Sequence, residues 1–379
     1  MAPDAETKER GDIARLARIL KLILGQLLLL VLVLIAVVFA GEWYARKKFP
    51  DLAYVAERQQ RPEDLFVQFD ARYGWANRPG ADTRFRRRDF DTHVEINERG
   101  FRGPVFAPPD SVFSVAVLGD SYVFGHGVEE NETFSALLRE KWPFAAVGNF
   151  GVIGYSTDQE LLLLDDVVLP SEPDVVLLCL YRNDILDNGQ PTAWGIYQKP
   201  YFKREANGEL KLRAAVEPSV PLSMRIRREI QRRFVLYDVL AFRLAGLRAE
   251  SHGEDPAAAF GESGPSESER LTADLIDTMA SKCEARGVRF LLVVLPGLSD
   301  TAFLAGVPPP GVGSRLDLAP AFEEYERLHP DSALGFTYDS HWNPRGHRLV
   351  ADTIAAKVEA LGWLPGSGPP SSAPSTSSK

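Results

Sequence analysis

The feature that most constrains the fold is a short apolar run that stops at a tight turn. Residues 112–118 read Val-Phe-Ser-Val-Ala-Val-Leu and are followed by Gly119, Asp120 and Ser121. A run of this length and composition predicts a buried strand, and the Gly-Asp-Ser tripeptide predicts a sharp turn after it. Open α/β folds bind their ligands outside the carboxyl ends of their strands. The pattern therefore predicts that the Ser121 hydroxyl lies at the ligand-binding edge of a sheet.

Further apolar runs follow, and they alternate with segments of helical periodicity. Continuous apolar strands separated by helices are typical of a parallel sheet that is covered on both faces. We expect strands at 113–118, 144–149, 174–180 and 288–294, and helices at 132–141, 157–168, 268–285 and 345–361.

The N-terminal region predicts a membrane anchor. Residues 22–40 are apolar except for Gly25 and Gln26, and at about 1.5 Å per residue they reach across a bilayer core of about 30 Å. Trp43 and Tyr44 follow the run, as interfacial aromatic residues do. We predict a retained single-pass anchor in the cytoplasmic (inner) membrane, with the catalytic part on the extracytoplasmic, periplasmic side. Basic residues flank both ends, so the opposite orientation stays open.

The rest of the chain divides by composition. The insertion carries a basic helical segment at 221–248, which is either a solvated face or a contact for anionic lipid or an acidic polymer. The expected parts are a cytoplasmic tail at 1–21, the transmembrane helix at 22–40, a lead-in with a β hairpin at 44–111, an α/β domain at 112–362 with an insertion at 187–266, and a disordered Ser/Pro-rich tail at 366–379.

Charge and cysteine content exclude several classes. The net charge of −9 argues against a general nucleic-acid-binding protein. Cys179 and Cys283 are the two cysteines of the chain, so neither a disulfide framework nor a cysteine-based zinc site is expected. Two separately buried thiols are favoured over a pair, and the pairing stays open.

A base for Ser121 is offered far downstream by Asp339 and His341. Residues two apart in an extended segment point the same way, so Asp339 can orient the His341 ring while the other ring nitrogen faces the serine. Asn343 and Pro344 come next and are typical of a helix start. Serine, histidine and aspartate together form the set that makes a hydroxyl nucleophilic.

A serine nucleophile also needs donors for the oxyanion of a tetrahedral intermediate. The turn at 149–154 follows the second strand, and its glycines allow the backbone to approach a ligand closely. The turn at 181–184 follows the third strand, where Asn183 offers a side-chain amide. Both turns are expected at the same edge of the sheet as Ser121.

The roles of other polar residues near these turns are less specifically predicted. His126 lies on the loop after the serine, where it either lines the pocket or is a surface histidine. Asp184 is an alternative to Asp339 as the partner of a histidine. Asp120 is expected to stabilise the turn, and His347 is expected to be structural. Val123 replaces the second glycine of a Gly-x-Ser-x-Gly elbow, which argues against the α/β-hydrolase fold.

The order of these blocks resembles the SGNH, or GDSL-type, hydrolase superfamily. The resemblance covers about 112–362 and implies a three-layer, flavodoxin-like α/β fold. The superfamily contains esterases, lipases, carbohydrate acetylesterases and O-acetyltransferases. The blocks are Gly119-Asp120-Ser121, then 149–154, then Asn183-Asp184, then 339–343.

The resemblance assigns roles residue by residue. Ser121 would be the nucleophile, with its own amide in the oxyanion hole. Gly154 would add its backbone N–H, and Asn183 would add its side-chain amide. His341 would be the base and Asp339 its partner. No metal or cofactor is required by this scheme.

The sequence departs from the superfamily pattern at two places. Tyr181 stands where the third block commonly has glycine, which makes Tyr181 and Asp184 candidates for the pocket wall. The last block is Asp-x-His in place of the common Asp-x-x-His. That spacing resembles SGNH domains of polysaccharide O-acetyltransferases and of membrane-anchored envelope proteins, as does the segment 96–103 before the first block.

These features predict a membrane-anchored serine esterase or O-acyltransferase that acts on O-acyl, chiefly O-acetyl, groups of an envelope glycan. The expected partners are the membrane and an acylated glycan or other ester. Transfer would need a multi-span membrane partner that supplies the acyl donor. Two alternatives stay open: a non-catalytic domain that binds envelope polymer or scaffolds an assembly, and a phospholipase or lipase at the membrane surface.

Overall fold

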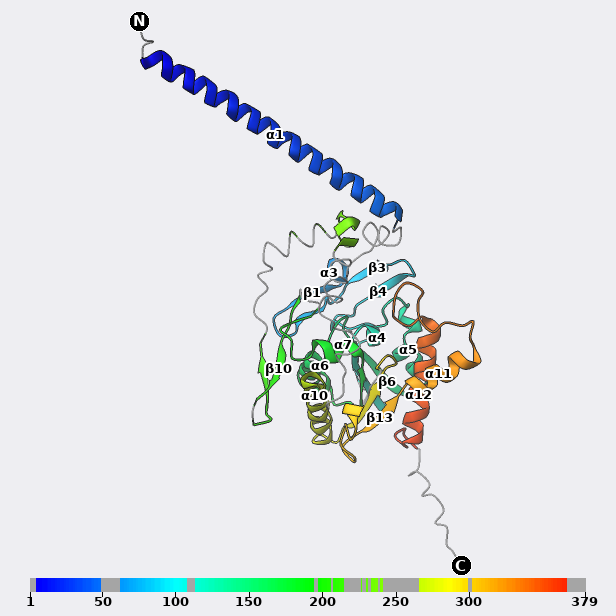
Figure 1. The fold of residues 1–379 in the computed structure, drawn as a ribbon. Coiled ribbons are helices and arrows are strands. Elements are labelled where there is room, and N and C mark those ends of the chain that lie inside the picture. Colours follow the sequence, from blue (N-terminus) through cyan, green and yellow to red (C-terminus); the bar gives the residue numbers. More distant parts are fainter. Residues whose placement is uncertain are drawn as a thin grey trace, which may run out of the picture. The chain divides into compact units, whose positions relative to one another are not determined.

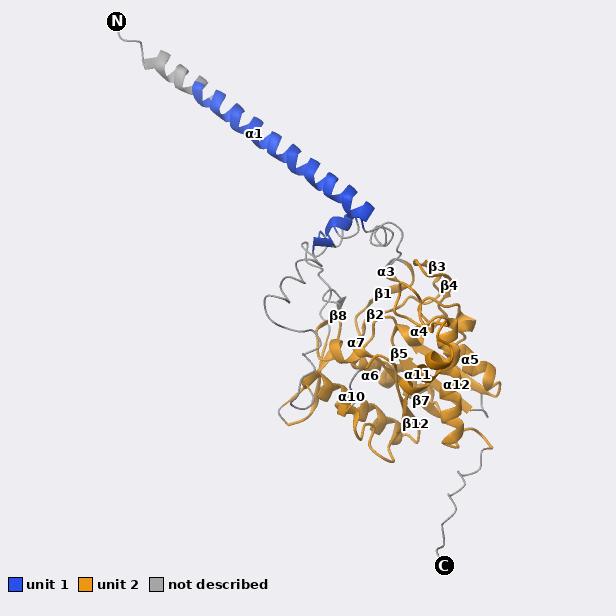
Figure 2. Cartoon of the chain, turned by 45° about the vertical axis from the view of Figure 1, so that its right-hand side comes forward, with its two compact units in different colours: residues 1–58, 221–259 blue, residues 59–220, 260–379 orange. Residues whose placement is uncertain are grey.

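The computed structural model describes residues 5–48, 62–107, 113–193, 197–205, 207–214, 266–298 and 302–366, with a few positions between 226 and 240. The chain divides into two compact units, Met1–Arg58 with Pro221–Ala259 and Gln59–Val220 with Phe260–Lys379 (Figure 2). The tail predicted to be disordered and most of the basic segment at 221–248 lie outside the described residues.

The first unit is built on one long helix, α1 (Ala5–Lys48) (Figure 1). Its stretch Arg18–Lys48 is long and apolar enough to cross a membrane, which fits an anchor or a signal sequence. Near the end of α1, the Glu42 carboxylate accepts hydrogen bonds from the backbone N–H of Val235 at 3.0 Å and of Leu236 at 2.9 Å. A segment of the predicted insertion is therefore bound to this end of α1.

The second unit contains a five-stranded parallel sheet in the order β13-β12-β7-β5-β6. Counted along the chain this is the flavodoxin-like order, with the topological switch point between β5 and β7. The predicted parallel α/β fold is thereby confirmed. The strands are β5 (Phe113–Gly119), β6 (Ala145–Gly151), β7 (Val175–Leu180), β12 (Arg289–Val294) and β13 (Ser314–Asp317).

Helices cover both faces of the sheet because successive strand residues point to opposite sides. Ala116 and Leu118 pack into the core shared with α6 and α10, while Val115 and Val117 pack into the core shared with α5, α11 and α12. The helices are α5 (Phe134–Lys141), α6 (Thr157–Leu163), α10 (Glu267–Glu284), α11 (Ala319–Leu328) and α12 (Pro344–Ala360).

The lead-in before the sheet packs on the same unit through an aromatic core. Phe66, Phe85 and Phe90 are buried together with Phe124 of the α/β part. The lead-in elements are α3 (Pro62–Leu65), the antiparallel pair β1 (Val67–Asp70) and β2 (Gly74–Asn77), and the antiparallel pair β3 (Asp82–Arg86) and β4 (Asp91–Glu95).

Short elements follow the third strand of the sheet. Helix α7 begins directly after Tyr181, and two small antiparallel pairs follow it. They are α7 (Arg182–Asp187), β8 (Thr192–Ala193) with β9 (Tyr197–Gln198), and β10 (Tyr201–Arg204) with β11 (Leu210–Arg213).

Candidate active site

The turn after β5 places Ser121 at the start of a short helix, α4 (Ser121–Phe124). Asp120 caps this helix, because its carboxylate accepts the backbone N–H of Tyr122 at 2.9 Å. Asp120 therefore has the turn-stabilising role expected of it. Burial raises the pKa of its carboxyl group. The serine itself lies at the carboxyl edge of β5, beside the switch point of the sheet.

Strand β6 approaches the serine turn closely at Gly151. A Cβ atom at Gly151 would lie 2.2 Å from the backbone nitrogen of Phe124, so this position accepts only glycine. Asn149 secures the approach: its amide donates to the Val123 carbonyl at 2.8 Å, and its side-chain oxygen accepts the Gly151 N–H at 2.9 Å. The second sequence block thus holds the turn that presents Ser121.

The structure brings Ser121, His341 and Asp339 together, although the serine is far from the other two in sequence. The Oγ of Ser121 lies 2.7 Å from Nε2 of His341. Nδ1 of His341 is hydrogen-bonded to Oδ1 of Asp339, which also accepts the backbone N–H of His341 at 3.0 Å. The Nδ1–H of the ring therefore donates to the carboxylate, and the Nε2 lone pair points toward the serine hydroxyl.

Asp339 is ionised in this arrangement. Burial alone would raise its pKa, but hydrogen bonds from His126 and His341 outweigh burial and hold the pKa of Asp339 well below its usual range. A permanently ionised carboxylate fixes the tautomer of His341 and stabilises the imidazolium that forms when the ring takes a proton.

Tyr122 supports the loop that carries the histidine. Its ring lies 4.8 Å from the ring of His341, and its hydroxyl donates to the Ser340 carbonyl at 3.0 Å. The same ring contacts Tyr181, at 4.5 Å between centroids. Tyr181 is thus linked through Tyr122 to the loop that carries His341.

Two backbone N–H donors lie in the turns that follow β5 and β6. The N–H groups of Ser121 and Gly154 have no acceptor among the described residues. Gly154 is buried and adopts a left-handed conformation with φ of 76°, which favours glycine. Free donors of this kind are what an oxyanion hole requires.

Asn183 lies in the first turn of α7, and its side chain is hydrogen-bonded to the turn after β6. Its side-chain nitrogen donates to the Tyr155 carbonyl at 3.1 Å, and a hydrogen bond from the Asn183 side chain to the Asp120 carboxyl group acts to lower the pKa of that group. Tyr155 directly follows Gly154. The two oxyanion candidates are therefore tied together through one backbone carbonyl.

Asp184 does not serve as a histidine partner. Its side chain is fully buried, and one carboxylate oxygen accepts the backbone N–H of Tyr181 at 2.7 Å to cap α7. Burial raises the pKa of Asp184 well above its usual value. The carboxyl group caps a helix in the interior, where it does not form an open pocket wall.

Sequence reasoning missed a buried ion pair close to these turns. The Lys199 ammonium lies 2.7 Å from Oδ2 of Asp158, and both side chains are inaccessible to solvent. Asp158 also accepts the backbone N–H of Gly189 and of Phe202, both at 2.9 Å. The pair fixes the segment after α7 on α6, and it has no local signal in the sequence.

One group of side chains has the composition of a metal site. Ligand atoms of His126, Asp339 and His341 lie within 4.8 Å of one another. Hydrogen bonds already account for the geometry, because both nitrogens of His341 face Ser121 and Asp339. Hydrogen bonds are therefore sufficient to hold these side chains together.

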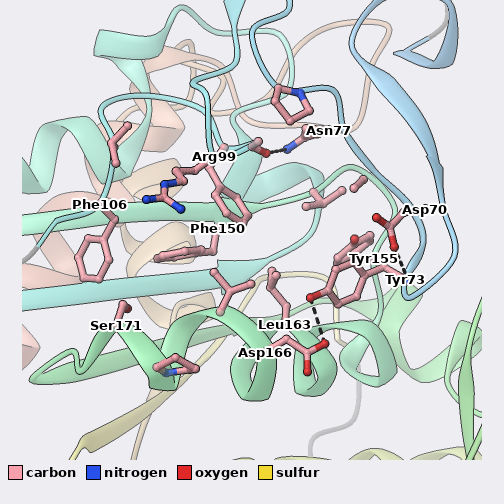
Figure 3. A pocket seen from close by; sticks show the side chains of 18 of the residues that line it. Asp70, Tyr73, Asn77, Arg99, Phe106, Phe150, Tyr155, Leu163, Asp166 and Ser171 are labelled. Carbon is pink, nitrogen blue, oxygen red and sulfur yellow. Dashed lines mark hydrogen bonds between the residues drawn. The ribbon is translucent and has the colours of Figure 1, made fainter.

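A separate pocket of about 670 Å³ opens beside β6 (Figure 3). Tyr73, Phe150 and Tyr155 line it, and the Tyr73 hydroxyl donates to Asp166 at 3.1 Å. No member of the Ser-His-Asp group lines this pocket. It is therefore not the place where a substrate carbonyl would meet Ser121.

Comparison with known proteins gives likenesses of fold. No protein-family profile matches the chain. No curated protein sequence matches it.

Among solved structures, the chain is similar to an esterase, EstA, from Pseudoalteromonas sp., with 13% identity, a TM-score of 0.38, and coverage of 65% of this chain and 97% of that one. It is similar to an acetyl xylan esterase, AlAXEase, with 17% identity, a TM-score of 0.39, and coverage of 65% and 100%. An acetylxylan esterase mutant from Geobacillus stearothermophilus shows 12% identity, a TM-score of 0.36, and coverage of 67% and 97%. The strand order gives this chain a flavodoxin-like fold, and its four sequence blocks resemble those of SGNH hydrolases.

Proposed function

We propose that this chain is a membrane-anchored serine esterase or O-acyltransferase that acts on O-acyl, chiefly O-acetyl, groups of an envelope glycan. The observation that carries the proposal is the 2.7 Å contact between Ser121 Oγ and His341 Nε2, with Asp339 on the other ring nitrogen. This is the arrangement that activates a serine hydroxyl.

The geometry supports a two-step mechanism. Ser121 Oγ attacks the acyl carbonyl carbon while its proton passes to His341 Nε2, and Asp339 stabilises the imidazolium. The N–H groups of Ser121 and Gly154 and the side-chain amide of Asn183 would bind the oxyanion. Collapse of the intermediate breaks the ester C–O bond, and the departing sugar oxygen takes the proton from His341.

The second step returns the enzyme to its starting state. His341 removes a proton from water or from a sugar hydroxyl, and the oxygen attacks the carbonyl carbon of the acyl-enzyme. The bond between that carbon and Ser121 Oγ then breaks, and Oγ takes the proton back from His341. Water gives hydrolysis with release of the free acid, and a sugar hydroxyl gives transfer. Incubating the full chain with a donor ester and candidate glycans separates these outcomes, since only transfer yields an acylated glycan.

The location proposed for this reaction follows from α1. An apolar helix that continues past bilayer length favours an anchor, and Trp43 and Tyr44 next to it are exposed, as expected for an interfacial belt. An anchored catalytic unit outside the cytoplasm would meet envelope polymers. For transfer, a multi-span membrane partner would supply the acyl group, because a single helix offers no route across the bilayer.

The test is the Ser121→Ala variant of the full chain in detergent, assayed with an activated acetyl ester. We expect kcat/KM to fall by at least about a thousandfold, since a triad residue acts with its partners as a unit. A fluorophosphonate should label the wild type at Ser121 and should not label this variant.

The matched control is Ser340→Ala. Ser340 is exposed and lies next to His341, and the contact it makes to Tyr122 uses its backbone carbonyl, which the variant keeps. This control should retain wild-type turnover and labelling. Unchanged turnover in Ser121→Ala would disprove the assignment, and an unlabelled wild type would favour a non-catalytic polymer-binding domain. Fatty acid release from phospholipid vesicles would favour a lipase.

A further inference from the structure

His126 contacts both Asp339 and His341. Its Nε2 lies 3.3 Å from Oδ2 of Asp339, and its side chain is 6% exposed. Its ring is stacked on the ring of His341, with centroids 4.2 Å apart and planes inclined by 27°. Asp339 therefore lies between two imidazoles, and each of its oxygens faces one of them.

The contact defines the tautomer of His126. A carboxylate can only accept hydrogen bonds, so the proton of His126 must be on Nε2. Its Nδ1 is buried and has no partner among the described residues. Burial lowers the pKa of His126 to about 4, so the ring is neutral at neutral pH. A neutral ring can remain stacked on His341 when His341 becomes a cation during acyl transfer.

The loop that carries His126 has little freedom. Gly125 and Gly127 flank it with φ of 82° and 89°, and a Cβ at Gly127 would lie 2.6 Å from the ring of Phe336. The backbone N–H of His126 donates to the Ser121 carbonyl at 3.0 Å. The position of the ring is thus coupled to the serine turn.

A buried arginine from the lead-in fixes this loop. The Arg102 guanidinium, of which 1% is exposed, donates to the carbonyl oxygens of Gly125 at 2.6 Å and Val128 at 2.7 Å. Burial lowers the pKa of Arg102 to about 10. Two lead-in rings, Phe85 and Phe90, meet the ring of His126 edge-on at 5.2 and 5.3 Å.

We propose that His126 is a positioning residue for the acyl-transfer site, and this rests on the function proposed above. Through its Nε2–H it holds Asp339 in the orientation in which the other carboxylate oxygen meets His341. Its ring packs on His341 and keeps that ring directed at Ser121. The lead-in, through Arg102 and its aromatic core, is accordingly a component of the active site.

Two substitutions of the full chain separate the hydrogen bond from the packing. His126→Phe keeps an aromatic ring and removes the donor, whereas His126→Gln places an amide nitrogen where Nε2 lies. We expect kcat for an activated acetyl ester to fall about 10- to 100-fold in His126→Phe, as outer-shell partners of active groups typically show. KM should stay within about twofold, and His126→Gln should recover most of the loss.

The exposed His329 supplies the control, and His329→Gln should behave as the wild type. The proposal is overturned if His126→Phe keeps kcat within about twofold, or if the Gln variant is no better than the Phe variant, since packing alone would then explain the effect.

A second readout does not depend on turnover. In ¹⁵N-histidine NMR spectra of the wild type, His126 should be neutral with its proton on Nε2 between pH 6 and 8, and the Nδ1–H signal of His341 should move in His126→Phe. A proton on Nδ1 of His126 would refute the contact with Asp339 even if the ester assay works. Absent turnover in the wild type, with the expected spectrum, would count against the proposed function and leave the contact established.

Discussion

Three histidines of this chain show how surroundings decide what one side chain does. His341 is partly exposed and has both ring nitrogens hydrogen-bonded, which suits a group that must gain and lose a proton. His126 and His347 are almost fully buried. Nδ1 of His347 accepts the backbone N–H of Phe134 at 3.3 Å and helps to start α5. That role needs a neutral ring, and burial lowers the pKa of His347 to about 3.

The buried His347 predicts a measurable pH dependence of stability. The unfolded chain binds a proton at this residue below its ordinary pKa of 6.5, while the folded chain does so only near 3. The free energy of unfolding that His347 contributes therefore falls as the pH drops from about 6.5 toward 3. His347→Asn keeps an acceptor for Phe134 and cannot titrate. Relative to the wild type, this variant should gain about 2 to 3 kcal/mol between pH 6.5 and pH 4.5.

The variant must be compared with the wild type, because buried carboxyl groups change the free energy of unfolding with pH in the direction opposite to His347. Burial raises the pKa of Glu160 and Asp184, so their contribution to stability is lost as the pH rises above the ordinary carboxyl range. Urea unfolding of both proteins in detergent, followed by tryptophan fluorescence, gives the difference. A difference that does not change with pH would show that His347 titrates alike in the folded and unfolded states, and that burial does not hold the ring neutral.

Residues next to the end of a predicted element could be found from sequence, and residues defined only by packing could not. Ser121 follows a strand, and Asp339 and His341 precede a helix, so a local pattern locates all three. His126 contacts Asp339 only because the fold brings distant loops together. Arg102 lies in the segment 96–103, which the sequence did point out. Its burial against carbonyl oxygens is a tertiary property that the sequence does not show.

At the scale of elements, the start of α12 controls the histidine loop. The Asn343 side-chain oxygen caps the helix by accepting the N–H groups of Arg345 at 2.9 Å and Gly346 at 3.3 Å. Its side-chain nitrogen donates to the carbonyls of Ala333 at 2.8 Å and Gly335 at 2.9 Å. One residue thus closes both ends of the loop that carries His341.

This double role predicts different effects of two substitutions. Asn343→Ala loses the cap and should lower the free energy of unfolding by about 1 to 2 kcal/mol. Asn343→Asp keeps an oxygen for the cap and loses the two donors. Both variants should lower kcat by a similar factor, because both release the loop around His341. Steady-state kinetics with an activated ester measures kcat of both variants. Wild-type kcat in Asn343→Asp would show that the cap alone positions the loop.

Element prediction succeeded where apolar periodicity was strong and failed where it was weak. The four inner or long strands are apolar on both faces and were predicted close to their observed bounds. β13 (Ser314–Asp317) was not predicted, because it is short and lies at the edge of the sheet. Three of its four residues are polar, so it has no apolar run. The helix predicted at 157–168 ends at Leu163 and continues as a π-helical turn, which no local propensity signals.

At the scale of the whole molecule, the orientation of α1 decides which substrates the site can meet. Basic residues flank both ends of the span, so charge leaves both orientations open, and the proposed function requires the C-terminus to lie outside the cytoplasm. Alkaline phosphatase fused to the C-terminus should then be active, and a fluorescent protein that folds only in the cytoplasm should be dark. The reverse pair of results would exclude an envelope glycan as the substrate.

If α1 anchors the chain in a membrane, as we propose, the binding of Val235 and Leu236 to Glu42 has a consequence for release from that membrane. The chain leaves the catalytic unit at 220, enters the unit of α1, and returns at 260. A protease that cuts between 49 and 58 therefore severs one covalent connection, while the segment around 235 still holds the end of the anchor through Glu42. Shedding of the catalytic unit would need a second event, either another cut or the loss of the hydrogen bonds that Glu42 and Arg46 make with this segment. With α1 as an anchor, we expect a single cut between 49 and 58 to leave the catalytic unit attached to the membrane.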